Sequence, residues 1–223
     1  MRERIRSWRF GRRIAALAAS DNPLLRDYAA CRWPSPRTPL HEAKLLALDF
    51  ELDGLGRTAH LLQAGWVPFD RSGIALGRAE AADIRSARRL KDEAVVVHGI
   101  GEERARGGEP LESVLAKLVP TLGGRILVAH GAQIEREAIE RTTQALYGEA
   151  LPVRAICTLA LERRLNPNLV GSDAYRLASC RKRYNLPPYE QHDAFSDALA
   201  AAELLLAQLT RMPGDVRLGA LEC

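Results

Sequence analysis

Residues 45–51 read Leu45-Leu46-Ala47-Leu48-Asp49-Phe50-Glu51, an apolar run that ends in two acidic residues one position apart. A short apolar run of this kind indicates a buried strand. Because side chains alternate along a strand, we expect Asp49 and Glu51 on one face and Phe50 on the other. Two carboxylates this close repel each other unless a cation lies between them, and Mg²⁺ and Mn²⁺ prefer clustered oxygen ligands. The segment therefore predicts a strand that ends at a metal site.

The complementary segment lies far along the chain and reads His192-Asp193-Ala194-Phe195-Ser196-Asp197. It opens the alanine- and leucine-rich residues 198–209, which predict a helix that Asp193 caps. Asp197 then lies in the first helical turn, and His192 lies in the preceding loop. An imidazole next to clustered carboxylates predicts a divalent-metal site with a histidine base.

Composition limits the class of protein. The 223 residues are enough for one substantial core with an extension, and 47% apolar and 27% charged residues are typical of a soluble globular protein. No apolar run approaches the roughly 20 residues of a membrane span, so we expect no membrane association. The four cysteines are scattered, which predicts reduced thiols and a cytoplasmic location. Cys157 and His192 as nucleophile and base form a weaker alternative to a buried, structural Cys157.

Positive charge is concentrated at the start of the chain. Residues 1–44 hold ten Lys or Arg and four Asp or Glu, a balance of +6, and the remainder has a balance of −2. A basic arm suits a polyanion such as nucleic acid, and an arginine face that only keeps a helix solvated explains the charge equally well. We expect any protein partner to use this extension.

The pattern along the chain predicts an α/β fold with an N-terminal helical extension. Residues 1–40 are expected to hold two helices, 2–19 and 22–32, and a proline-rich connector, and this extension is expected to pack on the main domain. The main domain then covers residues 41–212, and a short tail covers 213–223.

Within that domain a meander precedes alternating units. Strands are expected at 45–51, 60–68 and 73–76. Strands at 125–129 and 152–156 then alternate with helices, which indicates parallel strands covered by helices. The helices are expected at 111–118, 132–147 and near Leu159, Tyr175 and Ala198.

Three motifs together resemble the DEDDh 3′-5′ exonucleases, a family that includes the epsilon subunit of bacterial DNA polymerase III and RNase T. The pattern D-x-E-T-T-G-L appears as Asp49-Phe50-Glu51-Leu52-Asp53-Gly54-Leu55, and V-A-H-N-x-x-F-D appears as Val128-Ala129-His130-Gly131-Ala132-Gln133-Ile134-Glu135. The pattern H-x-x-x-x-D is residues 192–197. A fourth match, Val97-His98-Gly99-Ile100, is similar to a family segment that lies against the terminal nucleotide.

The resemblance implies a ribonuclease-H-like mixed sheet flanked by helices and a two-metal exonuclease. Two divalent cations, Mg²⁺ or Mn²⁺, would activate a water and stabilise the charge that phosphodiester hydrolysis adds. His192 would accept the proton of that water. The implied metal ligands are Asp49, Glu51, Glu135 and Asp197. The implied substrate contacts are Leu52, His98, His130 and Ile134.

Several positions depart from the family pattern. Glu135 stands where aspartate is usual and is one methylene longer, so its reach differs while its charge does not. Glu137 is a rival for the same role, but two residues turn a helix by about 200°, so both cannot face the site. The other departures are Gly131 for asparagine, Ile134 for phenylalanine, Leu52-Asp53 for Thr-Thr and Gln63 for a frequent glutamate.

Three functions follow as alternatives. The epsilon-like pattern favours release of nucleoside 5′-monophosphates from the 3′ ends of single-stranded DNA. An RNA-trimming 3′-5′ exoribonuclease is the second. A nucleic-acid- or polymerase-binding module that lost activity through Gly131, Ile134 and Glu135 is the third. The run Arg181-Lys182-Arg183-Tyr184 offers charge and an aromatic ring to a single strand, although a solvated helix end is the favoured interpretation.

Overall fold

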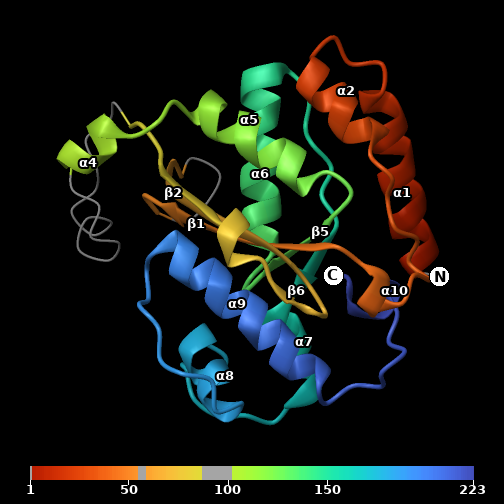
Figure 1. Ribbon diagram of the computed structural model, residues 1–223, viewed down its shortest axis with the longest axis vertical. Helices are drawn as coiled ribbons and strands as arrows, with labels where there is room; N and C mark the ends of the chain where they lie inside the picture. The colour runs from red at the N-terminus through yellow and green to blue at the C-terminus, as the bar shows by residue number, and fades with distance from the viewer. Residues whose placement is uncertain (1, 55–58, 87–101) are drawn as a thin grey trace.

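A computed structural model describes residues 2–54, 59–86 and 102–223 (Figure 1). Its centre is a six-stranded sheet in the order β3-β2-β1-β5-β6, with β4 paired to β2. The strands are β1 Leu45–Leu52, β2 Leu61–Asp70, β3 Gly73–Ile74, β4 Glu80–Asp83, β5 Ile126–Ala129 and β6 Ala155–Cys157. The expected mixed α/β sheet is confirmed.

The sheet is antiparallel on one side of β1 and parallel on the other. Strand β1 pairs antiparallel with β2 and parallel with β5, which in turn pairs parallel with β6. The expected meander is present, but the short strand β4 was missed. Its sequence, Glu80-Ala81-Ala82-Asp83, contains no β-branched or aromatic residue and therefore carries no strand signal.

Helices cover both faces of the sheet. Helices α5 and α6 lie on one face, and α7, α8 and α9 lie on the other, while α4 projects at one end (Figure 1). The helices expected at 111–118, 132–147 and near Leu159, Tyr175 and Ala198 are present as α5 to α9, whereas α4 and α10 were not expected. The bounds are α4 Glu102–Gly107, α5 Leu111–Leu122, α6 Gln133–Tyr147, α7 Thr158–Leu165, α8 Leu177–Arg183, α9 Ala194–Leu209 and α10 Leu218–Leu221. None of these described helices combines the length and hydropathy that a membrane span requires.

The N-terminal extension shares the core of the domain. It consists of α1 Arg2–Leu17 and α2 Pro23–Ala30, and the Asn22 side chain caps α2. Leu17 and Tyr28 are buried in the same apolar cluster as the sheet, and the Tyr28 hydroxyl donates a hydrogen bond of 2.8 Å to the carbonyl of Pro152. The extension is therefore packed against the domain through apolar and polar contacts.

The last residues of the chain also pack on the sheet. Leu218 and Leu221 are buried in the cluster beneath β1, and Glu222 forms an antiparallel bridge with Ile156 of β6. Packing consequently continues across the expected boundary between residues 212 and 213.

Candidate active site

Strand β1 aims two carboxylates at helix α9. Leu45 and Ala47 pack in the same cluster as apolar residues of α9, and Asp49 and Glu51 continue that alternate face. Phe50 is buried in the cluster on the opposite face of the sheet. The alternation expected from the sequence is confirmed, and it places both carboxylates between β1 and the first turn of α9.

The structure brings three of the expected metal ligands together. Asp49, Glu51 and Asp197 each offer a carboxylate oxygen, and these oxygen atoms all lie within 4.8 Å of one another. Glu51 is buried, and the other two are partly buried. Residues far apart in the sequence thus form one acidic cluster where β1 meets α9.

Gly65 allows α9 to approach this closely. It lies opposite Asp49 in the β1–β2 ladder, and a Cβ at this position would overlap the backbone nitrogen of Phe195 in α9. Any side chain would therefore push the first turn of α9, with Asp197, away from β1. Sequence analysis missed Gly65, although a glycine inside a strand pattern is a recognised sign of close backbone approach.

Gln63 ties the same helix to two strands. Its side-chain oxygen accepts a 2.9 Å hydrogen bond from the backbone N–H of Ala194, and its Nε2 donates to Asp83 at 3.2 Å and to Asp193 at 3.3 Å. An amide meets both demands because it accepts at one atom and donates at the other. A glutamate here would repel both aspartates, which gives the departure at this position a physical reason.

Glu135 contributes a fourth, more deeply buried carboxylate. It lies in the first turn of α6 with 4% exposure, and its Oε2 has no hydrogen-bond partner among the described residues. Glu137 is exposed and accepts a hydrogen bond from Gln133, so the rival residue faces away, as expected. An unpaired buried carboxylate oxygen is costly, and a divalent cation would satisfy it.

The carboxylates raise one another's pKa. Burial, followed by the charge of Glu135, holds the pKa of Asp49 well above its ordinary value. Burial and the charges of Asp197 and Asp193 raise the pKa of Glu51 to about 7, and burial raises that of Glu135 to about 8. Burial also raises the pKa of Asp197. Such a set retains protons near neutral pH, and divalent cations would favour its charged form. The donor set and the unpaired Glu135 oxygen fit Mg²⁺ or Mn²⁺.

His192 lies at the exposed rim of the acidic cluster. Its backbone is left-handed, with φ of 65°, and its N–H donates a 2.8 Å hydrogen bond to Oδ2 of Asp197. Asp193 caps α9 by accepting from the N–H of Ser196, which confirms the expected cap. This turn holds the histidine backbone beside Asp197 and leaves the residue exposed to solvent.

Arg181 and Tyr189 support this loop. Tyr189 donates a side-chain hydrogen bond to Asp197, and its ring lies 5.0 Å from the Arg181 guanidinium carbon. Arg181 is 2% exposed, pairs with Glu203 at 2.7 Å, and donates to the carbonyls of Ala200 and Pro187 at 2.9 Å each. The expected solvated helix end is therefore wrong at Arg181, which anchors the loop to α9.

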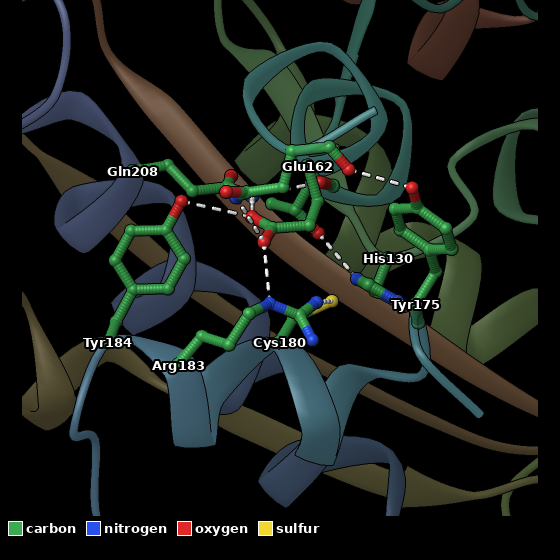
Figure 2. A network of polar contacts seen from close by, with 9 residues as sticks. His130, Glu162, Tyr175, Cys180, Arg183, Tyr184 and Gln208 are labelled. Atoms are coloured by element: carbon green, nitrogen blue, oxygen red, sulfur yellow. Dashed lines mark hydrogen bonds and ion pairs between the residues drawn. The ribbon is translucent and has the colours of Figure 1, made fainter. Parts of the chain in front are cut away.

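Another buried carboxylate, that of Glu162, accepts hydrogen bonds from several side chains within the protein (Figure 2). It accepts from Arg183 at 2.9 Å, Tyr184 at 3.0 Å and Gln208 at 2.8 Å. Burial raises the pKa of Glu162, but these hydrogen bonds outweigh burial and hold it below its ordinary value. Arg183 and Tyr184 consequently join α7, α8 and α9 rather than forming a solvated helix end.

His130 has a structural position beside this network (Figure 2). Nδ1 is 2.9 Å from the Thr158 hydroxyl, and Nε2 is 2.8 Å from the carbonyl oxygen of Tyr175. Both ring nitrogens are engaged inside the protein, so the expected direct contact of this ring with substrate is corrected to a role in joining β5 to α7 and the α7–α8 loop.

The other expected substrate contacts have different surroundings. Ile134 is 45% exposed at the start of α6, whereas Leu52 is partly buried and packs against the main core cluster. His98 and the rest of 97–100 lie outside the described residues. Of the two described residues, Ile134 is the more exposed, and it directly precedes Glu135 in the sequence.

Comparison with known proteins places the fold and the motifs in one family. The sequence profile described as "Exonuclease", of the RNase T type, matches residues 46–205. The DNA polymerase III PolC-type protein of Listeria welshimeri is 25% identical over 170 residues, which are 74% of this chain and 11% of the relative. The DNA polymerase III subunit epsilon of Aquifex aeolicus is 25% identical over 114 residues, 51% of this chain and 55% of the relative.

A solved structure shares the fold. The nuclease domain of 3′hExo, described as a DEDDh family member bound to rAMP, superposes with a TM-score of 0.67 at 13% identity. The match covers 81% of this chain and 98% of that one. The chain spans about a tenth of the PolC-type relative and about half of the epsilon relative.

Proposed function

We propose that this chain, which belongs to the exonuclease family of the DEDDh type, removes nucleotides from the 3′ ends of single-stranded DNA as 5′-monophosphates. One observation carries the proposal: three carboxylate oxygens lie within 4.8 Å of one another, beside the buried and unpartnered Oε2 of Glu135. Structural acids are normally paired, as Glu162 is, so a carboxylate cluster beside an oxygen that has no partner among the described residues is suited to holding cations.

Each residue has a role in the proposed reaction. Asp49, Glu51 and Asp197 hold the cations, and Glu135 adds a fourth carboxylate. Two bound divalent cations supply activation of a water and stabilisation of the phosphoryl charge. His192, at the exposed rim, accepts the proton of the attacking water and releases it to solvent. Tyr189 and the backbone N–H of His192 orient the Asp197 carboxylate.

DNA is the favoured substrate because both curated relatives are named as parts of DNA polymerase III. The exoribonuclease alternative is supported by the solved nuclease domain that is bound to rAMP. We place the activity in the cytoplasm, which is supported by the four cysteines, all within the described ranges and all free thiols. Cys157 is buried and caps α7 through its sulfur, which favours its structural interpretation.

Digestion of 5′-labelled single-stranded DNA and its RNA counterpart, with Mg²⁺ or Mn²⁺, tests the proposal. We expect a ladder that shortens from the 3′ end and disappears with EDTA or His192→Ala. Glu137→Gln is the matched control, because this acid lies two residues from Glu135 but faces solvent. A ladder on RNA alone would select the exoribonuclease. Absence of cleavage, with Mn²⁺ and DNA still bound, would select the binding module.

A further inference from the structure

Helix α1 has an outward face that the domain does not use. It lies at one edge of the molecule, away from α4 and the start of α9 (Figure 1). Its apolar residues face inward: Leu17 is buried, Ile14 packs on the main core cluster, and the Phe10 ring lies 4.9 Å from that of Trp33. The opposite face exposes Arg4, Ile5, Trp8, Arg9 and Arg12.

An exposed tryptophan is the most unusual member of this face. Trp8 is 59% exposed, and the guanidinium carbon of Arg12 lies 5.0 Å from the centre of its ring. Tryptophan is highly buried on average, and Trp8 is exposed together with Ile5 and three arginines rather than alone, which suits this face to binding. Paired aromatic and guanidinium planes are the surfaces on which single-stranded bases stack.

The charge of this face is positive and is not neutralised within the helix. Helix α1 contains six arginines and one acid, Glu3, whose side chain lies against Gly219. Two of the arginines serve internal contacts: Arg6 donates to the carbonyl of Glu222 at 2.8 Å, and Arg13 pairs with Glu140 at 2.8 Å. Arg4, Arg9 and Arg12 are left on the exposed side, where they favour an anionic partner.

Two adjoining cavities lie between the inner side of this helix and the start of α6. A cavity of about 270 Å³ between α1 and β6 is lined by Arg6, Arg9, Arg13, Arg136 and Arg154, among others. It shares Arg136 and Cys223 with a cavity of about 580 Å³ that reaches Gly131, at the start of the segment that carries Glu135. The buried Nε of Arg136 has no hydrogen-bond partner among the described residues. Arginines thus line the inner side of α1 as well, up to the second cavity, which also contains Glu137 and Glu140.

We propose that the outward face of α1 binds single-stranded nucleic acid upstream of its 3′ end. Trp8 stacks on a base, and Arg4, Arg9 and Arg12 contact phosphates. The identity of the ligand rests on the proposed exonuclease function. A membrane surface fits this helix less well, because Phe10, Ile14 and Leu17 pack toward the domain and Ile5 and Trp8 are the only large apolar side chains that α1 exposes among the described residues.

Binding of a fluorescent oligothymidylate of roughly 30 nucleotides to the Asp49→Asn protein tests this surface without turnover. We expect Trp8→Ala, made in this background, to weaken binding about fivefold or more. Joint replacement of Arg4, Arg9 and Arg12 by glutamine should lower the slope of log affinity against log salt concentration by about 2. Arg71→Gln, at an exposed arginine in the β2–β3 turn, is the matched control and should change neither.

A trinucleotide separates this surface from the active site. Because three nucleotides are too short to span both, its hydrolysis by otherwise wild-type protein should be unaffected by Trp8→Ala. If Trp8→Ala bound the long oligonucleotide with unchanged affinity, the proposal would be overturned. It would also be overturned if Trp8→Ala slowed hydrolysis of the trinucleotide as much as it weakened binding of the long oligonucleotide. If Trp8→Ala lost binding to phosphatidylserine vesicles but kept its binding to the oligonucleotide, the proposal would be overturned as well. If the wild-type protein cleaved neither DNA nor RNA, the exonuclease proposal would fail while the binding measurement still decided this one.

Discussion

Two of the buried glutamates, Glu135 and Glu162, differ in how the protein satisfies them. Glu162 accepts hydrogen bonds from an arginine, a tyrosine and a glutamine, and its pKa lies below the ordinary value. Glu135 has an unpartnered buried oxygen, and its pKa is raised to about 8. Both lie in helices that pack on the same sheet. The comparison teaches that satisfied carboxylates join elements, whereas unsatisfied carboxylates mark where a ligand is needed.

The largest effect is expected from a substitution in the acidic cluster. Asp49→Asn should lower exonuclease kcat at least about 10³-fold, because a cation ligand is lost. It should not lower the free energy of unfolding measured in EDTA, since one repelling charge is removed. Single-turnover cleavage and urea unfolding measure the two effects. A metal-free variant clearly less stable than wild type would show that Asp49 is structural, like Glu162.

The reverse pattern is expected at the satisfied carboxylate. Glu162→Leu should lower the free energy of unfolding by about 3 kcal/mol, because Arg183, Tyr184 and Gln208 lose their common partner. Cleavage by the folded fraction should change much less. Urea unfolding provides the measurement, and Glu137→Gln on the exposed face of α6 provides the control. A loss smaller than that of the control would contradict the comparison.

Gly65→Ala tests how the acidic cluster is assembled. The added methyl group should displace the first turn of α9 and separate Asp197 from Asp49, which lowers kcat about 100-fold. Gly77→Ala, at an exposed glycine with open space around it, is the matched control for the loss of a glycine. Equal activity of Gly65→Ala and wild type would show that the close approach of α9 is dispensable.

The pH dependence of stability distinguishes the two kinds of carboxylate. Folding raises the pKa of Glu51 to about 7 and that of Glu135 to about 8. Their contribution to the free energy of unfolding is therefore complete below pH 4.5 and is lost as the pH rises to 8. Each such group changes the free energy of unfolding by up to about 1.4 kcal/mol per pH unit. Glu162 acts in the opposite sense, because its pKa is lowered on folding. It stabilises the fold above pH 4.5, and this stabilisation is lost as the pH falls.

Urea unfolding in EDTA between pH 5 and 8 measures this dependence. Stability should decline across that range, and Glu135→Gln or added Mn²⁺ should flatten the decline. A decline that is identical in wild type and Glu135→Gln would assign it to other groups.

Tyr189→Phe is expected to have the smallest effect. Loss of the hydroxyl that donates to Asp197 should weaken Mn²⁺ affinity about tenfold and leave the fold intact, because the ring still stacks on Arg181. Isothermal titration with Mn²⁺ measures the change, and Tyr175→Phe, whose hydroxyl bonds the Asn166 carbonyl, is the control. Unchanged Mn²⁺ affinity would remove Tyr189 from the site.

Local patterns in the sequence were sufficient for much of the architecture. The period-two pattern at Asp49 and Glu51, the Asp193 cap and the opposed directions of Glu135 and Glu137 all depend on neighbours a few residues away, and the structure has each as expected. Strand β4 was missed because its residues have no strand preference of their own. It forms only because the edge of β2 provides a partner.

What the sequence determined by itself is the type of chemistry: acids and a histidine, placed at element ends and in the order of one family. What only the tertiary structure decided is which polar groups are satisfied. Gly65, Gln63, Arg181 and Tyr189 act through partners distant in the chain, and the ring of His130 is committed to Thr158 and Tyr175. The physical reason is that hydrogen bonding and burial depend on atoms brought together by folding, whereas strand and helix periodicity depend on adjacent residues.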